Sequence, residues 1–363
     1  MPHQIRPRVL AQLCCVALLG LSGCVATPPS QESTFTPPVY PSPPDEPRFI
    51  FEQTLRYNSN VQAESDLSAL RRFATGEKAI VKGLIKPFDV AATQGRVYVT
   101  DTVQRALIMF DIEGQRYAEF GHEAPGELFK PIGLDISIDN EIYVADVSAQ
   151  RISVFDLEGQ FLRYIGDRSL LTKPSDIAIS KDGRTAFVID TGGVDNKNHQ
   201  LHIFDAKTGE HRKTIGQRGK EEGEFNLPLQ LASAENNLVY IVDKGNFRVQ
   251  SFTADGNFEQ SFGSIGRMPG QFFSPKGIAT DADNNLYVVD TAFGNVQIFN
   301  EQGQLLMVIG QRGQSSLPGN YMLPAGIDVD EQGRIYIVDQ FFRKVDIYRP
   351  INIPARAPID AED

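Results

Sequence analysis

The stretch that decides the fold is residues 274–310, SPKGIATDADNNLYVVDTAFGNVQIFNEQGQLLMVIG. After Ser274 it has a proline, a short apolar segment, a polar turn and an apolar run that ends at Asp290, and it then alternates polar turns with apolar segments up to Gly310. This pattern occurs six times, with 14 to 16 residues from its proline to its aspartate. The prolines are Pro87, Pro131, Pro174, Pro228, Pro275 and Pro324, and the aspartates are Asp101, Asp146, Asp190, Asp243, Asp290 and Asp339. Repeats of about 40–50 residues made of short strands predict the blades of a β-propeller.

Within the quoted repeat, four segments have the composition of strands, and turns rich in Gly, Asn and Asp separate them. The segments are 275–280, 286–289, 296–299 and 304–309. The second segment is apolar at every position, which is typical of a strand covered on both faces. Four antiparallel strands in each of six repeats predict an all-β, six-bladed β-propeller.

The phrase at 274–299 resembles the NHL repeat, and so does the connector GQRGKEEGEFNLP at 216–228. The connectors at 263–275 and 310–324 are similar to that connector. The resemblance covers residues 80–350 and implies a bacterial NHL-like propeller with six blades. It also brings two functional expectations to weigh, because some NHL propellers bind RNA through a basic face and some lyases with NHL-like repeats use a histidine-bound metal.

The propeller is expected to span residues 48–350, with a polar tail at 351–363. The sixth repeat has a third strand at 344–348 but no fourth strand after it. Residues 48–56 have strand character and precede the first repeat, so we expect them to complete the last blade. An independent edge strand is the alternative. Residues 66–73 carry apolar side chains at three-residue spacing, which favours a short helix.

Residues 1–23 are expected to be a lipoprotein signal peptide rather than part of the fold. Two arginines precede an apolar run that is too short for a standard membrane span. The run ends in Leu21-Ser22-Gly23-Cys24, which resembles the bacterial lipobox, so Cys24 is the predicted site of lipidation. Residues 24–47 then form a tether with eight prolines, which favours an extended chain. Val25 follows the cysteine, and this residue favours the outer membrane by the enteric sorting pattern.

The net charge of −11 argues against nucleic acid as a partner, because binding to nucleic acid requires Lys and Arg to neutralise phosphates. The same charge argues against adhesion to anionic lipid through a basic patch. All three cysteines lie within the first 24 residues, so we expect no disulfide and no thiol chemistry in the propeller. Together with the lipobox, these observations lead us to expect a lipid-anchored envelope protein without a nucleic-acid partner.

The six repeat aspartates are expected to be structural, because each lies where the second strand meets a turn, and Asp caps such turns. The start of each first strand is a better candidate for ligand binding, because this strand lines the channel of a propeller. Two residues after the proline, three repeats have glycine where the others have Asp89, Asp176 and Gln230, and Lys276 is a neighbouring candidate. Such a rim could bind a sugar, a cationic group or calcium. A solvated channel mouth with local hydrogen bonds is the alternative.

The third repeat carries five extra residues within 191–199. Polar insertions of this kind often carry function, so Asp195, Asn196 and His199 are further ligand-binding candidates. A tolerated surface insertion is the alternative.

Signals for catalysis are few. Four histidines follow the signal peptide, and His199 with His202 would bind a metal only with further ligands. No nucleophile and base stand in a recognisable arrangement. We therefore predict no catalytic residue, no metal site and no cofactor, with calcium or another divalent cation in the channel left open.

These observations predict a non-catalytic propeller in the periplasm or at the cell surface that binds proteins of an envelope or secretion assembly, or an extracellular glycan. The alternative is a metal-dependent envelope hydrolase or lyase, which stoichiometric zinc in the purified protein would favour. A purely structural spacer is a third possibility, and crosslinking without any captured partner would indicate it.

Overall fold

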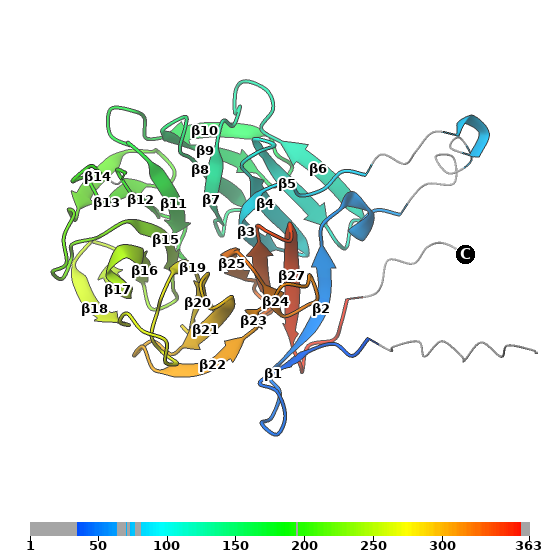
Figure 1. The fold of residues 1–363 in the computed structure, drawn as a ribbon. Helices are drawn as coiled ribbons and strands as arrows, with labels where there is room; N and C mark the ends of the chain where they lie inside the picture. The colour runs from blue at the N-terminus through cyan, green and yellow to red at the C-terminus, as the bar shows by residue number, and fades with distance from the viewer. Residues whose placement is uncertain (1–34, 64–69, 71–72, 77–80, 194, 357–363) are drawn as a thin grey trace, which may run out of the picture. The chain divides into compact units, whose positions relative to one another are not determined.

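Six antiparallel sheets make up the fold, and Figure 1 shows them arranged around a centre. Five have four strands, and the sixth has a further two-residue strand at its outer edge. The computed structural model describes residues 35–63, 70, 73–76, 81–193 and 195–356. Contacts divide the chain into residues 1–36 and residues 37–363, and the fold lies in the second unit. The predicted all-β, six-bladed propeller with four antiparallel strands per blade is confirmed.

Each blade runs from an inner strand at the centre to an outer strand at the rim. Blade 1 contains β3 (Pro87–Thr93), β4 (Arg96–Asp101), β5 (Ala106–Asp111) and β6 (Arg116–Phe120), and blade 2 contains β7 (Pro131–Ile136), β8 (Glu141–Asp146), β9 (Arg151–Asp156) and β10 (Phe161–Ile165). Blade 3 contains β11 (Pro174–Ile179), β12 (Thr185–Asp190), β13 (Gln200–Asp205) and β14 (His211–Ile215), and blade 4 contains β15 (Pro228–Ser233), β16 (Leu238–Asp243), β17 (Arg248–Thr253) and β18 (Phe258–Phe262). Blade 5 contains β19 (Pro275–Thr280), β20 (Leu286–Asp290), β21 (Asn295–Phe299) and β22 (Leu305–Ile309), and blade 6 contains β25 (Pro324–Val329), β26 (Ile335–Asp339), β27 (Lys344–Pro350) and β2 (Phe49–Leu55).

A few short elements complete the described structure. They are β1 (Val39–Tyr40), the pair β23 (Gln311–Arg312) and β24 (Asn320–Tyr321), and the 3-10 turns η1 (Asn58–Asn60) and η2 (Lys244–Asn246). β1 pairs with β2 on the outer edge of blade 6, so a strand lies within the segment that the sequence assigned to a tether.

The hydrophobic core is divided among the six junctions between neighbouring blades. Six separate clusters of buried side chains are found, one for each pair of adjacent blades. In β20, Leu286 and Val288 pack toward blade 4, whereas Tyr287 and Val289 pack toward blade 6. The unbroken apolar run in this strand therefore reflects a sheet that is covered on both faces, as the sequence predicts.

The ring is completed by a strand from the N-terminal side of the repeats. β2 pairs antiparallel with β27, and the paired residues run from Phe49 opposite Pro350 to Leu55 opposite Val345. Figure 1 shows β2 in blue beside β27 in red. β2 thereby supplies the fourth strand that the sixth repeat lacks.

The inner strands β3, β7, β11, β15, β19 and β25 contact one another in this order, and β25 contacts β3. All six begin at the repeat proline and run in the same direction, so the channel they surround has two distinct ends. We call the side that carries the six prolines and the turns after the repeat aspartates the proline face. We call the side that carries the turns after the inner strands the opposite face.

Several sequence predictions fall outside the described residues. They include the signal peptide at 1–23, Cys24 and residues 357–363 of the tail, and the helix expected at 66–73 lies largely outside them as well. Within the described part of the chain, no helix has the length and hydropathy needed to cross a membrane.

Candidate functional site

The six repeat aspartates hold the proline face together through backbone hydrogen bonds. The carboxylate of Asp146 accepts N–H groups from Phe129 and Lys130 before the proline, and from Ser148 and Ala149 in the following turn, at 2.6 to 3.0 Å. The other five also accept backbone N–H groups, and all six are essentially buried. Their contacts are those of the structural role expected from the sequence.

Three of the six inner strands have glycine two residues after the proline, where neighbouring strands approach closely. A Cβ atom on Gly133 would lie 2.6 Å from the Cα of Asp176 in the next blade, and a Cβ on Gly326 would lie 2.5 Å from the Cα of Asp89. Contacts this short do not occur in real structures, so these two positions exclude any side chain. The glycines make room for the Asp89 and Asp176 side chains.

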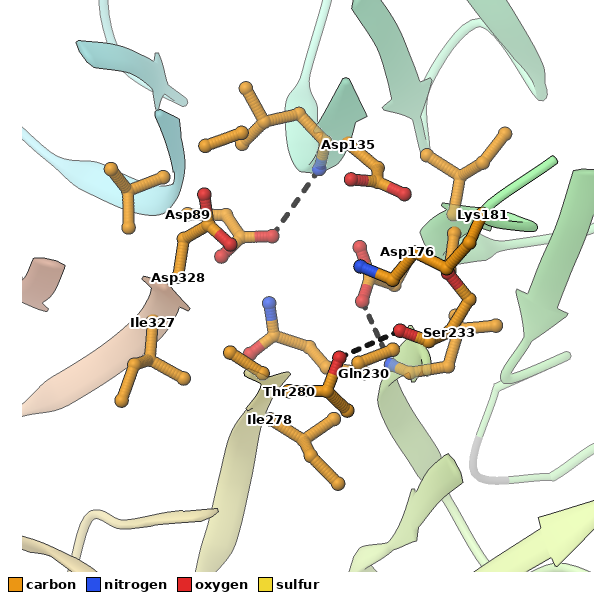
Figure 2. Close-up of a pocket in the computed structure, with 18 residues that line it drawn as sticks. Asp89, Asp135, Asp176, Lys181, Gln230, Ser233, Ile278, Thr280, Ile327 and Asp328 are labelled. Carbon is orange, nitrogen blue, oxygen red and sulfur yellow. Dashed lines mark hydrogen bonds between the residues drawn. The ribbon is translucent and has the colours of Figure 1, made fainter. Parts of the chain in front are cut away.

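Asp89 and Asp176 each bind the inner strand of the following blade. The N–H of Leu134 donates to Asp89 Oδ2 at 3.2 Å, and the N–H of Leu231 donates to Asp176 Oδ2 at 2.9 Å. Gln230 lies beside them in the same cavity, and Figure 2 shows the three side chains directed toward its centre.

Two further aspartates, Asp135 and Asp328, make the same kind of link and were missed in the sequence. The N–H of Ile179 donates to Asp135 Oδ2, and the N–H of Ala92 donates to Asp328 Oδ2, both at 2.7 Å. Both lie four residues after the repeat proline, where the other four repeats have alanine. Comparing the repeats at that position would have found them. Together the four carboxylates join the inner strands of blades 6, 1, 2, 3 and 4.

Burial makes these carboxylates hard to ionise. Desolvation raises the pKa of Asp89 to about 7 and the pKa of Asp328 to about 7, although both accept backbone hydrogen bonds. Desolvation also raises the pKa of Asp135, and it raises the pKa of Asp176 well above its usual value, with the charge of Asp89 adding to the effect. The described residues form no ion pair with these four carboxylates within 4.0 Å.

Lys276, the fourth residue of the expected rim, lies apart from this cavity. Its Nζ is 3.2 Å from Gln340 Oε1 and 4.4 Å from the centre of the Phe88 ring. Burial lowers the pKa of Lys276 to about 8. The structure therefore brings Asp89, Asp176 and Gln230 together inside the channel and leaves Lys276 at its proline end.

The insertion in blade 3 divides into a buried and an exposed part. His199 is fully buried, with Nε2 3.2 Å from the carbonyl oxygen of Gly193 and Nδ1 accepting the N–H of Leu227 at 3.1 Å. It thus fastens the insertion to the connector of blade 4. Asn196 accepts the N–H of Asn198, and Asp195 is exposed. None of the three lines the channel cavity.

The predicted histidine pair does not converge on one point. His202 makes its hydrogen bond to Thr214 within blade 3, whereas His199 binds backbone groups. Within the described ranges, no group of three or more His, Cys, Asp or Glu side chains is placed to hold a metal ion.

Two cavities occupy the channel. The inner one has a volume of about 50 Å³ and is lined by Asp89, Asp176 and Gln230 together with Asp135 and Asp328. The outer one, of about 280 Å³, shares Asp135, Lys181 and Asp328 with it and continues to the turns of the opposite face. The channel is therefore hollow toward the opposite face, whereas the sequence analysis expected binding at the proline end.

The raised carboxylate pKa values predict a stability that falls as pH rises. A carboxyl group with a pKa of 3.8 in the unfolded chain and about 7 in the folded chain binds more protons when folded between these two values. Because Asp135 and Asp176 remain, we expect the double substitution Asp89→Asn and Asp328→Asn to reduce this dependence while keeping an acceptor oxygen for each N–H group. Chemical denaturation from about pH 5 to about pH 8 should show the variant gaining stability relative to the native protein.

This difference reports the two replaced carboxyl groups together with their effect on the pKa of Asp176. Burial lowers the pKa of His202 to about 4, so His202 gives the opposite slope below its ordinary pKa of 6.5, but it is common to both proteins and cancels. A stability difference that stays constant with pH would contradict the assignment.

A family model described as "6-bladed beta-propeller" matches residues 82–191 and 279–349. No curated protein matches the chain. A structural-genomics protein of unknown function from Bacteroides thetaiotaomicron is 19% identical, with a TM-score of 0.60 over 82% of this chain and 76% of that one. A gluconolactonase from Xanthomonas campestris is 14% identical, with a TM-score of 0.55 over 83% of this chain and 98% of that one. A virginiamycin B lyase from Staphylococcus aureus is 14% identical, with a TM-score of 0.51 over 76% of this chain and 85% of that one. These similarities establish the fold alone.

Proposed function

We propose that this six-bladed β-propeller is a non-catalytic binding platform of the bacterial envelope that holds a partner protein on its proline face. The observation that carries the proposal is a set of exposed apolar side chains on this face. They are Ile85, Val103, Phe129, Phe273, Leu323 and Phe341, each between 40% and 56% exposed.

These side chains belong to the loops that the repeat aspartates hold. Ile85, Phe129, Phe273 and Leu323 lie one or two residues before a repeat proline, and Val103 and Phe341 lie in turns directly after a repeat aspartate. The backbone hydrogen bonds to the repeat aspartates hold these loops in place. They therefore also fix the positions of the apolar side chains. Rigid aromatic side chains that are already exposed are the usual anchors of protein interfaces.

Charge also distinguishes the proline face. Lys86, Lys130 and Lys173 each precede a repeat proline and are exposed, and Lys244 follows Asp243. The opposite face carries acidic turns instead, including Asp139, Glu235, Asp283 and Glu331. Apolar anchors with a lysine rim suit a partner surface that is apolar at its centre and acidic at its edge.

Replacing the three phenylalanines should test this role. We expect the triple substitution Phe129→Ser, Phe273→Ser and Phe341→Ser to keep the melting temperature and to weaken partner binding by at least about tenfold. The measurement is quantitative crosslinking and capture from native envelopes, followed by binding of the identified partner to the purified proteins.

The matched control is Ile138→Ser, because Ile138 is 73% exposed but lies on the opposite face. Equal loss of binding in the control, or full binding by the triple variant, would contradict the proposal. Capture of a glycan in place of a protein would assign the same face to a carbohydrate ligand.

The lipobox at Leu21–Cys24 is the basis for proposing that a lipid on Cys24 anchors the protein to the outer membrane. We expect Cys24→Ala to leave the precursor unprocessed or to release the protein from the membrane, because the thiol that accepts the lipid is absent. Detergent partitioning and the mass of the mature N-terminus measure this outcome. Fractionation of the native protein into inner and outer membranes tests the proposed outer-membrane location. Unchanged partitioning of Cys24→Ala would rule out lipid at this residue.

A further inference from the structure

The channel gathers four carboxyl groups whose ionised forms have no counter-charge in contact with them among the described residues. Asp89, Asp135, Asp176 and Asp328 all line the inner cavity, and Lys181 is the one basic residue among its lining residues. Lys181 is exposed in the turn after β11 and makes no ion pair with these carboxylates within 4.0 Å among the described residues. A cluster of buried carboxylates is costly unless a cation or donors accompany it.

Two oxygen atoms in the cavity also lack a donor. Asp176 and Gln230 are each 3% exposed, and neither Asp176 Oδ1 nor Gln230 Oε1 has a hydrogen-bond partner among the described residues. Figure 2 shows the two side chains directed toward the hollow between the inner strands. Buried acceptors of this kind are normally satisfied, so they indicate a donor that enters the cavity.

The shape of the channel restricts what can enter. The proline end is narrowed by Lys276 and Phe88, which meet across it at 4.4 Å. The wider cavity of about 280 Å³ leads in from the opposite face and narrows to about 50 Å³. The wall between the carboxylates includes four small apolar side chains and two hydroxyl side chains, namely Ala91, Ala178, Ala232 and Ala279 with Ser233 and Thr280. This funnel has a narrow end lined by carboxyl groups and alanine side chains, and a wider mouth lined mostly by acidic and hydroxyl side chains.

An ammonium group fits this arrangement better than a directly bound metal ion. Each carboxylate already gives one oxygen to a backbone N–H, and the described acidic side chains do not converge as a metal-binding group. An ammonium group carries three donors and one positive charge in a volume close to that of a water molecule. An unbranched alkyl chain behind it would lie along the alanine walls.

We propose that this funnel binds a primary ammonium group on an unbranched alkyl chain, with Asp176 and Gln230 accepting its hydrogen bonds. The chain then extends past Asp135 and Asp328 toward the opposite face. A free alkylamine and a lysine side chain of another protein both have this chemistry. The site lies at the other end of the channel from the proline face and does not depend on the function proposed for that face.

The test is calorimetric titration of the full chain in detergent with n-pentylammonium, with putrescine and with Nα-acetyl-lysine methylamide. We expect saturable binding of at least one of these, no binding of tetramethylammonium, and weaker binding as pH falls below about 7, with proton release near that pH. Binding of putrescine but not of the lysine derivative would assign the site to free amines, and the reverse would assign it to a protein side chain.

Two variants should change the affinity in opposite directions. Asp176→Asn should weaken binding by about tenfold or more, because it removes charge and turns an acceptor into a donor. Lys181→Gln should tighten binding, because it removes a competing positive charge from the mouth. The control Asp255→Asn alters an exposed carboxylate in the turn between β17 and β18 and should leave the affinity unchanged.

Three outcomes would overturn the proposal. They are calcium binding without ammonium binding, equal affinity in Asp176→Asn and the native protein, and no binding by any alkylammonium probe. Melting curves of each variant separate a lost site from a lost fold. Because the site is remote from Phe129, Phe273 and Phe341, the triple serine variant should bind the ammonium probes normally.

Discussion

Replacing Asp146 with alanine is expected to destabilise the protein by about 4 kcal/mol or more, which is among the largest effects of a single substitution in this fold. Its carboxylate accepts four backbone N–H groups, two from residues just before β7 and two from residues just after β8. The Asp146 side chain itself is 0% exposed. Alanine would remove the charged acceptor of all four donors, and a hydrogen bond to a charged group contributes about 1.5–3 kcal/mol. Denaturant unfolding followed by circular dichroism measures the loss.

The relative stabilities of three variants, Asp146→Ala, Asp146→Asn and Asp255→Ala, make this expectation specific. Asp146→Asn keeps one acceptor oxygen and should be intermediate, whereas Asp255→Ala removes an exposed carboxylate and should have little effect. A cost below about 1 kcal/mol for Asp146→Ala would show that water replaces these hydrogen bonds.

Removing β2 is expected to produce the second large effect. A chain that begins at Thr75 lacks the outer strand of blade 6, whereas a chain that begins at Pro37 keeps both β1 and β2. The loss exposes one edge of β27 and leaves the Arg334 guanidinium without Glu52 Oε2, which lies 2.9 Å from its Nε. Both side chains of this ion pair are almost fully buried, so breaking it by losing one partner is costly.

We expect the shorter chain to melt at a temperature at least about 10 °C lower and to associate through its free edge. Differential scanning calorimetry and light scattering on the two purified chains provide the comparison. Leu55→Ala in the longer chain is the matched point variant, because Leu55 is fully buried but its removal leaves the strand paired. Equal melting temperatures of the two chains would refute the importance of this closure.

The blade count and the strand positions were predictable because a repeat shows its periodic contacts directly in its sequence. Proline starts each inner strand, aspartate ends each second strand, and the apolar run between the turns marks a sheet covered on both sides. The pairing of residues 49–55 with the last blade could also be predicted from the sequence. The sixth repeat lacks a fourth strand, and one extra strand precedes the first repeat. These features depend on local composition and on counting.

The site was predictable only in part, because its geometry depends on how neighbouring blades meet. Asp89 and Asp176 stood out against glycine in the other repeats, but the reason for the glycines is a close approach to the next blade. Lys276 adjoins the same position in its repeat yet lies outside the inner cavity, because its Nζ lies over the Phe88 ring at the proline end of the channel. The direction in which the channel opens depends on the Lys276–Phe88 contact across blades, which no single repeat encodes.

The pairing of β2 with β27 has a consequence for the time course of biosynthesis. β2 is among the first parts of the fold to be synthesised, and its partner is the last strand of the final blade. While blades 1 to 5 form from contacts between neighbours in the chain, β2 remains unpaired. Its pairing with β27 closes a loop that contains nearly the whole propeller, and closing so long a loop is slow. A polypeptide that stops short of Lys344 therefore leaves the ring permanently open. The pairing of β2 with β27 therefore forms only after translation has reached the end of the last blade. Until then, the open ring exposes a free strand edge to proteases and chaperones.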